Sequence, residues 1–459
     1  MSKKDLIDPE ELLAVGREIV DHSKRGGADV AEAVVREGSE LSARVRLGKV
    51  EMLREASSRS ASIRVMRKGH VAVTSTSDLT PSGIQRFVTD ALELLDLSEQ
   101  DPFAGPADPE ELAKPPFETF DGYDSNVAEL DADTAIDHAL RAEESARSFD
   151  PRITNIQESA CSRVFGSTAT VLSSGFESAR SRTVMSIGVV ALADDEDHKK
   201  RRGSWHEVRR HLADLPPAEQ IGREAAQRTV DMLGARKVPT CEAAIVFPSE
   251  TARAMLGLLA SAILGSGIWR KTSYLIGREG TPVASELVNV VDDPFLPRGF
   301  GSRAHDGEGL ASRQNVIVSK GVLQTYLYDS YAARKLGRKS TASAARGAGG
   351  GVGPSTSNVI LTPSSDTTEA DIIASTKRGL LVRQMMGFGY NASTGDFSRG
   401  AAGLWIEDGR IAFPVSEVTI SSNLDTMLKG IDAVADGFVV RSSALSPMIR
   451  IASMTIAGG

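Results

Sequence analysis

The sequence predicts an α+β protein of two domains: an N-terminal α/β-type unit of antiparallel hairpins and helices at 1–238, and a C-terminal β-rich antiparallel domain at 239–459. Its 459 residues exceed the roughly 150 residues of one ordinary domain. In the first half, alternating apolar residues flank tight turns, and strands joined in this way pair antiparallel. In the second half, short apolar runs alternate with glycine turns. These three observations predict the fold class.

The first half begins with a helix, two hairpins and a second helix. Asp8-Pro9 supplies a capping carboxylate and a proline at the first helical position, and Gly26-Gly27 ends the helix. Apolar residues then alternate on both sides of Gly48-Lys49 and of Lys68-Gly69, which predicts two hairpins. Thr80-Pro81 opens the second helix, whose apolar residues recur at helical spacing.

The rest of the first half continues this mixture of helices and strands. Prolines and acidic residues crowd the segment 101–126, which predicts an irregular crossing segment or a long surface loop. Helical spacing resumes at 136–140, the segment 153–193 is typical of antiparallel strands, and 221–232 forms a last helical face. We therefore place the domain boundary directly after this helix, near Val238-Pro239.

The second half opens with a strand at 243–247, followed by an apolar segment at 254–269. Glycines and serines dilute this segment, and it is shorter than the ~20 residues that a bilayer requires, so we expect a buried helix and no membrane span. Short strands separated by glycine turns follow. They are expected at 286–291, 315–318, 322–328, 405–407 and 411–413.

Composition and charge narrow the classes of function. Hydrophobic residues make up 41% of the chain and charged residues 25%, as in ordinary globular proteins. The formal net charge of -8, from 61 acidic and 53 basic residues, offers no overall basic field for phosphate backbones, so nucleic-acid binding is disfavoured. Residues 1–11 lack the apolar core of a signal peptide, and Cys161 and Cys241 are the only cysteines, so we expect a cytoplasmic protein.

One candidate metal site is His206-Glu207 with His211, because a His-Glu pair and a second histidine can hold zinc and a general base on a helix. On a regular helix, five residues at ~100° each place the two rings about 140° apart. On a strand, an odd offset sends them to opposite faces. A bulged or kinked helix would be needed, and the nearby Arg202 and Arg209 would repel a dication. We favour a solvated basic edge.

Two further motifs have simpler interpretations than catalysis. The glycine run 346–354 resembles a phosphate loop, but no hydrophobic strand precedes it, no helix follows it, and Gly-Lys-Ser/Thr is absent. A mobile loop that lets another chain approach its backbone fits better. The side chains of His305-Asp306-Gly307-Glu308 could transfer protons, but a polar turn before a strand is the commoner meaning of such a segment.

Short motifs follow one another through the second half. In chain order they are Val246-Phe247-Pro248, the helix 255–264, Arg270-Lys271-Thr272-Ser273-Tyr274-Leu275, Val291-Asp292-Asp293-Pro294, Pro297-Arg298-Gly299, Asp306-Gly307-Glu308-Gly309, Pro354-Ser355-Thr356-Ser357-Asn358, the segment 394–403 (TGDFSRGAAG), Pro414-Val415-Ser416-Glu417 and Met454-Thr455-Ile456-Ala457-Gly458. Each is weak alone. Together their order and spacing closely resemble the TldE/PmbA branch of the TldD/TldE metallopeptidase family, and the first half is compatible with it.

The resemblance bears on the chemistry of the helix 255–264. In the catalytic TldD branch this helix looks like Leu-Leu-His-Glu-x-x-x-His, with two metal-binding histidines and a glutamate base. Here Gly257 and Ala262 stand at the ligand positions and Leu258 stands at the base position, and none of these side chains offers a lone pair. The resemblance therefore implies that this chain binds no cofactor, that zinc belongs to a TldD-like partner, and that the helix is a fully buried scaffold.

What the resemblance implies is a non-catalytic subunit of a cytoplasmic TldD/TldE-type metallopeptidase that processes or degrades unfolded or small peptides together with a TldD-like catalytic subunit. The name modulator of DNA gyrase also comes with this family. Two alternatives stay open. One is an autonomous zinc metallopeptidase that uses His206, Glu207 and His211, and the other is a stand-alone homodimer that binds peptides at a sheet edge.

We also expect this chain to line the path by which a peptide reaches the partner's metal. Glycines allow close backbone approach, and the residues after them could pair with an extended substrate. Arg399 is a candidate for holding a carboxylate, although a structural salt bridge is the commoner role of such an arginine. The other expected path residues are Gly349, Gly350, Gly351, Ser355, Thr356, Ser357 and Asn358.

Overall fold

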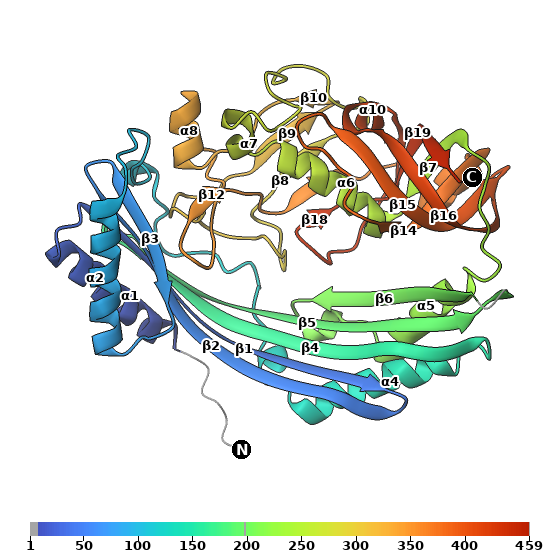
Figure 1. The fold of residues 1–459 in the computed structure, drawn as a ribbon, viewed down its shortest axis with the longest axis horizontal. Coiled ribbons are helices and arrows are strands. Elements are labelled where there is room, and N and C mark those ends of the chain that lie inside the picture. The colour runs from blue at the N-terminus through green and yellow to red at the C-terminus, as the bar shows by residue number, and fades with distance from the viewer. Residues whose placement is uncertain (1–7, 197–198, 459) are drawn as a thin grey trace.

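The computed structural model describes residues 8–196 and 199–458. Its first half is built on a six-stranded antiparallel sheet in the order β3-β2-β1-β4-β5-β6 (Figure 1). Both predicted hairpins are present, although the first turn lies at Leu47-Gly48, one residue earlier than expected. The strands are β1 (Val30–Arg46), β2 (Lys49–Arg67), β3 (His70–Thr76), β4 (Ile153–Leu172), β5 (Glu177–Asp194) and β6 (Lys200–Arg209).

The helices of the first half all pack against one face of this sheet. Residues 33, 35, 41 and 43 of β1 point to the helices, and their side chains are buried against apolar helical residues. Because side chains alternate along a strand, Arg36 and Gly38 lie on the other, concave face, above which the second half is placed (Figure 1). The helices are α1 (Pro9–Arg25), α2 (Pro81–Leu97), α4 (Ala132–Arg147) and α5 (Ala218–Val230).

The segment 101–126 is irregular, as expected, and it contacts the second half. It contains a 3-10 turn (Pro109–Glu111) and ends in the short helix α3 (Ser125–Ala128). Leu112 forms a β-bridge with Leu310 of the second half. Residues 231–240 between α5 and the first strand of the second half are largely irregular, and the domain division at 238/239 stays a prediction.

Residues 1–7, on which the expectation of a missing signal peptide partly rests, lie outside the described residues. Among the helices that the structure describes, none is long and apolar enough to cross a membrane.

The second half contains two larger sheets. One has the order β16-β15-β14-β7-β19-β17, and an additional pairing of β16 with β19 joins its two sides. Its strands are β7 (Cys241–Phe247), β14 (Arg378–Met386), β15 (Asp396–Glu407), β16 (Arg410–Asn423), β17 (Ile431–Val434) and β19 (Ile449–Ala457). The other has the order β10-β9-β8-β13-β18, with β8 (Val290–Asp292), β9 (Asn315–Ser319), β10 (Val322–Leu323), β13 (Val359–Leu361) and β18 (Ala444–Leu445).

Antiparallel pairing dominates the second half, as predicted, with two exceptions among the pairs of described strands. β7 pairs parallel with β14, and β13 pairs parallel with β18. Each exception joins strands that are far apart in the chain, and long connections permit parallel pairing. The remaining elements are the hairpin β11 (Ala344–Arg346) and β12 (Val352–Pro354) and the helices α8 (Ser330–Leu336), α9 (Glu369–Ala374) and α10 (Leu424–Lys429).

The apolar segment 254–269 differs from the single buried helix that we expected. It divides into α6 (Ser249–Ala262) and α7 (Gly265–Trp269), because Leu264 forms a parallel bridge with Leu327. The Gly265 amide donates to the Leu327 carbonyl at 2.8 Å. The same contact takes residues 324–328 out of the strand predicted at 322–328, so that β10 ends at Leu323. One face of α6 packs in the main core of the second half, while Ser261 is exposed.

Candidate functional site

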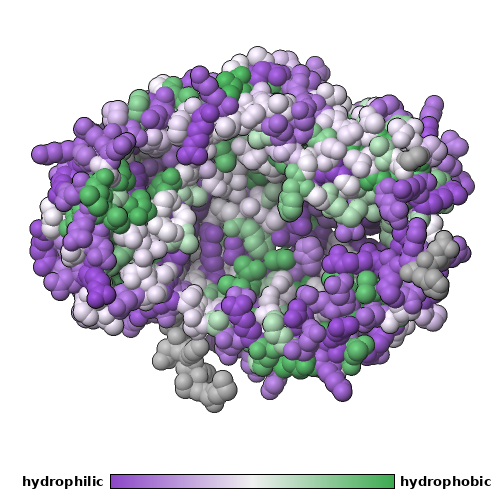
Figure 2. Space-filling model, in the orientation of Figure 1, coloured by the Kyte–Doolittle hydropathy of each residue, from purple (hydrophilic) through white to green (hydrophobic). Residues whose placement is uncertain are grey.

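The candidate site is the space between the concave face of the first sheet and the second half. Figure 2 shows that the molecule is hollowed there and that hydrophilic residues border the hollow. Several cavities lie between the halves, among them a smaller and a larger cavity that are both lined in part by β6. The smaller, about 20 Å³, also contacts the first turn of α6, and the larger, about 310 Å³, contacts β14 and β15.

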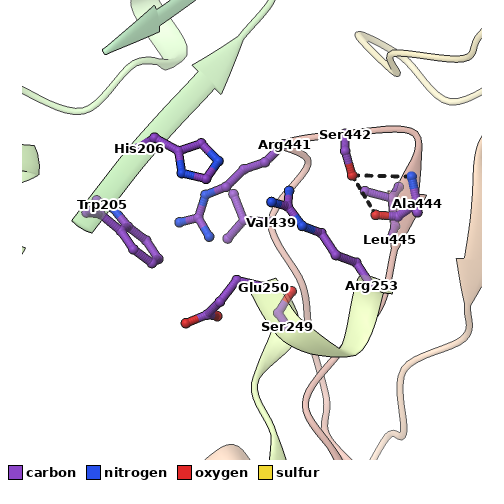
Figure 3. Close-up of a pocket in the computed structure, with 10 residues that line it drawn as sticks. All are labelled: Trp205, His206, Ser249, Glu250, Arg253, Val439, Arg441, Ser442, Ala444 and Leu445. Atoms are coloured by element: carbon purple, nitrogen blue, oxygen red, sulfur yellow. Dashed lines mark hydrogen bonds between the residues drawn. The ribbon is translucent and has the colours of Figure 1, made fainter. Parts of the chain in front are cut away.

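The three residues of the candidate metal motif do not converge. They lie on or just after β6, so the odd offset decides against a shared face. His206 lines the smaller cavity beside Arg253 and Arg441 (Figure 3), and partial desolvation and these two cations lower its pKa. The Nε2 atom of His211 lies 2.9 Å from the carbonyl oxygen of Asp121.

Glu207 has a structural partner instead of a metal. Its two carboxylate oxygens accept hydrogen bonds from Nε and Nη2 of Arg441 at 2.8 and 2.7 Å, although Arg441 follows it by 234 residues. Nη1 of Arg209 lies 2.7 Å from the same carboxylate, and the indole of Trp205 donates to it at 3.1 Å. The side chain is 4% exposed. This carboxylate therefore joins the edge strand β6 to the second half and is not a free general base.

The positions that correspond to the catalytic motif lie on α6. A side chain built on Gly257 would meet no atom within 4 Å, so this position faces open space. Leu258 packs against the main core, and Ala262 is 1% exposed. The residues present do not fit a metal, because no side chain at these positions can donate an electron pair. Within residues 8–196 and 199–458, no group of three or more His, Cys, Asp or Glu side chains could hold a metal ion.

The glycine run forms the turn of a hairpin that lies against the first sheet. Residues 347–351 connect β11 and β12, and the Gly347 amide donates to the Gly351 carbonyl at 2.9 Å. Gly350 has a φ of 90° and is buried, and a Cβ there would lie 3.0 Å from Cβ of Ser62. Gly349 and Gly351 are exposed, with open space beside them. Of the three glycines expected on the path, Gly349 and Gly351 remain accessible to another chain, and Gly350 does not.

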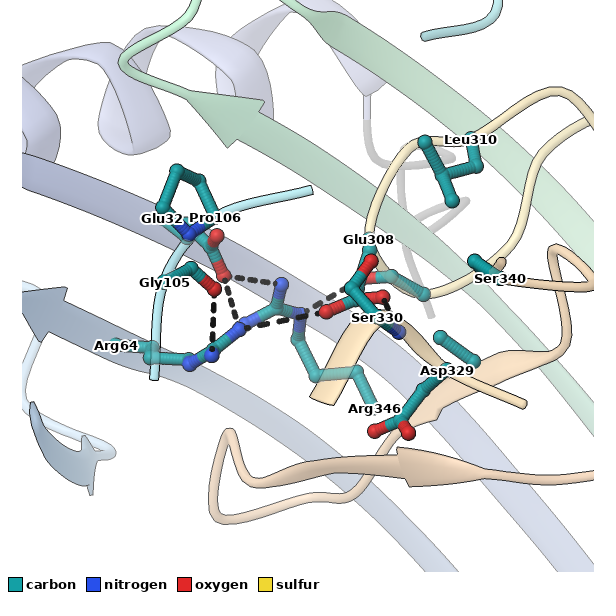
Figure 4. Close-up of polar contacts among 12 residues, drawn as sticks. Glu32, Arg64, Gly105, Pro106, Glu308, Leu310, Asp329, Ser330, Ser340 and Arg346 are labelled. Atoms are coloured by element: carbon teal, nitrogen blue, oxygen red, sulfur yellow. Dashed lines mark hydrogen bonds and ion pairs between the residues drawn. The ribbon is translucent and has the colours of Figure 1, made fainter. Parts of the chain in front are cut away.

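A buried ionic network fastens this hairpin to the first sheet (Figure 4). Nη2 of Arg346 lies 2.7 Å from Oε2 of Glu32, and Nη1 of Arg64 lies 3.3 Å from the same oxygen and 3.7 Å from Glu308. All four side chains are at most 8% exposed. Burial would raise the pKa of Glu32, but the charges of Arg64 and Arg346 outweigh it and hold this pKa below its usual value.

The pKa of Glu308 is shifted in the opposite direction. Burial and the neighbouring Asp306 raise its pKa to about 7, although Arg64 opposes the shift. Its Oε2 atom accepts a hydrogen bond from the amide of Ser330. The turn 305–308, for which acid–base catalysis was one interpretation, therefore belongs to the contact between the halves. His305 in this turn contacts Oγ of Ser178 on β5.

Two of the expected path residues are structural. Asn358 is fully buried, and its Nδ2 donates to the carbonyl of Asp293 at 2.7 Å and to Oγ of Ser302 at 2.8 Å. Its Oδ1 accepts from the amide of Gly301 at 2.8 Å. Ser357 is 1% exposed, and its amide donates to the buried Asp292 at 2.6 Å. These side chains hold a loop in place and cannot touch a substrate, which corrects the prediction for both.

The other expected path residues remain open to contact. Ser355 and Thr356 are half-buried. Arg399, on β15, has its guanidinium carbon 5.5 Å from the ring centroid of Phe397, and its Nε atom is buried without a hydrogen-bond partner. Arg399 forms no ion pair within the described part of the chain. The commoner interpretation of this residue as a structural salt bridge is therefore not supported.

The larger cavity was not predicted from the sequence. Basic side chains from β6, α5 and β14 line it, among them Arg202 and Arg383. The consecutive basic residues Lys200-Arg201-Arg202 are a local signal of a basic surface in the sequence. No local pattern connects it with Arg383, because these segments meet only in the folded chain.

Comparison with known proteins agrees with this architecture. Sequence models of PmbA/TldA metallopeptidase domains match the chain in three parts: domain 1 at residues 31–95, the central domain at 125–233 and the C-terminal domain at 240–458. The metalloprotease PmbA of Escherichia coli O157:H7 is 32% identical over 452 residues, covering 98% of this chain and 96% of its own length. A metalloprotease PmbA homolog of Haemophilus influenzae is 32% identical over 454 residues, with the same coverage.

More distant relatives extend these similarities. A metalloprotease TldD homolog of Haemophilus influenzae is 27% identical over 308 residues, covering 64% of this chain and 62% of its own. Among solved structures, a candidate modulator of DNA gyrase from Bacteroides thetaiotaomicron is 26% identical with a TM-score of 0.91, covering 98% of this chain and 99% of its own. TldE from Thermococcus kodakarensis shares the fold at 20% identity, with a TM-score of 0.85 and coverage of 97% and 100%. The chain belongs to the PmbA/TldA metallopeptidase family.

Proposed function

We propose that this chain is the non-catalytic subunit of a cytoplasmic PmbA/TldD-type metallopeptidase that acts on unfolded or small peptides. A TldD-like partner supplies the zinc and the catalytic base, and this chain supplies a wall of the substrate path. The observation that carries the proposal is the composition of α6, where Gly257, Leu258 and Ala262 replace the two ligands and the base.

Two further observations support a partner subunit. Haemophilus influenzae has both a PmbA homolog and a TldD homolog that are similar to this chain, as expected of two subunits from one family. Gly257 on α6 borders open space, so this ligand position is accessible although it offers no donor, whereas Ala262 at the second ligand position is buried.

Within this proposal, the peptide path includes the exposed or half-buried members of the expected set. These residues are Gly349, Gly351, Ser355, Thr356 and Arg399. The hairpin lies beside the concave sheet, and a backbone can approach its exposed residues Gly349 and Gly351 closely. Arg399, which lacks an ion pair, is suited to a carboxylate.

Purification from the native cells tests the subunit role directly. A tagged chain expressed at its natural level should co-purify with a TldD-like protein, and the complex should contain zinc and cleave an unfolded protein. The chain purified alone should contain no stoichiometric zinc and should cleave nothing. About one zinc per chain, lost in a His206→Ala variant, would instead establish the autonomous enzyme. A stable homodimer that binds peptides and never recovers a TldD-like chain would establish the stand-alone binding protein.

A further inference from the structure

We propose that the larger cavity, between the edge of β6 and an irregular part of β14, binds the carboxylate group of an extended peptide, with Arg202 and Arg383 as its cationic partners. The inference rests on the proposed function only in taking a peptide as the ligand. It assigns a recognition site to this chain that is separate from the partner's metal.

The first argument is the charge balance of the cavity. Its volume is about 310 Å³, and its lining holds basic side chains from β6, α5 and β14 against one acid, Glu417. Most of these cations already have partners: Lys200 pairs with Asp194, Arg201 with Asp195, and Arg228 with Glu224 and Glu250. Arg202 and Arg383 have neither an ion pair nor a side-chain hydrogen bond within the described residues. The cavity therefore has two cations without a direct partner, although the carboxylates of Glu250, Asp231 and Glu224 act on Arg383 from farther away.

The second argument is the local backbone at Arg383. In the pairing of β14 with β15, Val382 lies opposite Gly403 and Gln384 lies opposite Ala402, so Arg383 has no partner in the ladder. Such a bulge redirects a side chain, and bulges are frequent beside functional sites. A second register shift, between β15 and β16, leaves out Ala402, which also lines the cavity. Two irregularities of the sheet thus lie beside the larger cavity.

The electrostatic surroundings of Arg383 agree with an incoming anion. The side chain is half-buried, and desolvation together with the nearby Arg228 lowers its pKa, while Glu250, Asp231 and Glu224 oppose this shift. A bound carboxylate would remove the unfavourable interaction between the two cations. Arginine suits this role because its planar guanidinium can form two parallel hydrogen bonds with a carboxylate.

The third argument is the open edge of β6, which offers a place for the peptide backbone. β6 pairs only with β5, and within the described residues no backbone hydrogen bond occupies its outer edge (Figure 1). Residues 200–204 of this strand line the cavity. An extended peptide can add to such an edge through main-chain hydrogen bonds, while pockets select its side chains.

An apolar wall completes the cavity. Met232 and Ala402 are each 8% exposed, and Met386 is 42% exposed. Methionine side chains adapt to apolar groups of different shapes. A carboxylate next to an aliphatic side chain fits this combination. Both the C-terminus of a peptide that ends in an apolar residue and an acidic side chain with an apolar neighbour supply that chemistry.

Binding of labelled peptides to the purified full-length chain tests the inference, with fluorescence anisotropy as the readout. Three forms of one octapeptide are compared: a free C-terminal carboxylate without acidic side chains, its C-terminal amide, and the amide with one internal aspartate. We expect one or both carboxylate forms to bind at least about tenfold more tightly than the neutral amide, since hydrogen bonds to charged groups contribute about 1.5–3 kcal/mol. The form that binds identifies the source of the carboxylate.

Arginine variants connect this preference to the cavity. Arg383→Gln and Arg202→Gln should each weaken binding of the carboxylate peptide about tenfold to a hundredfold and leave the neutral amide unchanged. Arg202 is exposed, so its variant should fold normally, and Arg383→Lys should restore part of the affinity. Arg86→Gln, at an exposed position on α2 at the far end of the first half, is the matched control (Figure 1).

Equal binding of the neutral amide and the carboxylate peptides, or unchanged affinity in both glutamine variants, would overturn the inference. So would a chain that binds none of the three peptides at millimolar concentration. The subunit role is judged separately, by co-purification and zinc content, so either conclusion can fail without the other.

Discussion

The contact between the two halves can be tested at the Arg346–Glu32 pair. Replacing Arg346 by Met keeps most of the apolar stem and removes the charge that lies 2.7 Å from Glu32. The two side chains are 4% and 3% exposed, so water cannot replace the lost partner. Breaking a buried ion pair costs about 3–5 kcal/mol. Because Arg64 stays 3.3 Å from the same carboxylate, we expect the lower end, about 3 kcal/mol.

The corresponding shift in melting temperature follows from the size of the chain. Unfolding entropy near the midpoint is about 2.1 cal/mol/K per residue, which for 459 residues amounts to about 1 kcal/mol/K. If the halves unfold together, a loss of 3 kcal/mol therefore lowers the midpoint by about 3 °C. Urea unfolding at pH 7.5, followed by circular dichroism, measures the free energy itself. Arg410→Met, at an exposed arginine without an ion pair in the described residues, is the control and should not shift it.

A double-mutant cycle separates the charge interaction from lost packing. Glu32→Gln alone leaves Arg346 and Arg64 facing each other without their shared anion, so it should also be destabilising. The double variant removes both members of the pair and should cost less than the sum of the single variants by at least about 1 kcal/mol. An Arg346→Met chain within about 0.5 kcal/mol of the parent, or additive single effects, would refute the assignment of this network as the fastening between the halves.

Three further measurements test other parts of the structure. Gly257→Ala should stabilise the protein by about 0.5–1 kcal/mol, because alanine favours a helix interior and its Cβ meets nothing within 4 Å. Gly222→Ala should destabilise the protein, since that Cβ would lie 2.2 Å from a carbonyl oxygen. Equal effects of the two variants in thermal melts would contradict the described environment of α6. Burial and neighbouring arginines lower the pKa of His305 to about 4, below its unfolded value of 6.5. The contribution of His305 to the free energy of unfolding is present above pH 6.5 and is lost on acidification. Between pH 7.5 and 5 the unfolding free energy of the parent should therefore fall by about 2 kcal/mol more than that of His305→Gln. Parallel pH profiles of the two proteins would disprove this. Burial raises the pKa of the Cys161 thiol to about 12, so iodoacetamide at pH 8 should modify it only after unfolding, and mass spectrometry of the native protein should find at most Cys241 labelled.

Local signals were sufficient for most helices and hairpins. The capping carboxylate of Asp8 and the proline after it start α1 at the predicted residue. The turns after β1 and β2 need positive φ angles, and glycine at 48 and 69 permits them. That Gly257 offers no side-chain donor to a metal is also readable from its identity, whatever the fold. These features depend on residues a few positions apart in the chain, so they can be predicted from the sequence.

Features that depend on distant contacts required the folded chain. Leu327 divides the apolar segment into α6 and α7, and no signal within that segment indicates its partner. Glu207 finds Arg441 across 234 residues, which changes a candidate base into an anchor. Arg383 reaches the larger cavity because β14 is irregular opposite β15, and that register depends on the neighbouring strands. Sequence periodicity indicates which face of a strand is polar, but only tertiary packing decides which segment covers that face and which charges remain unpaired.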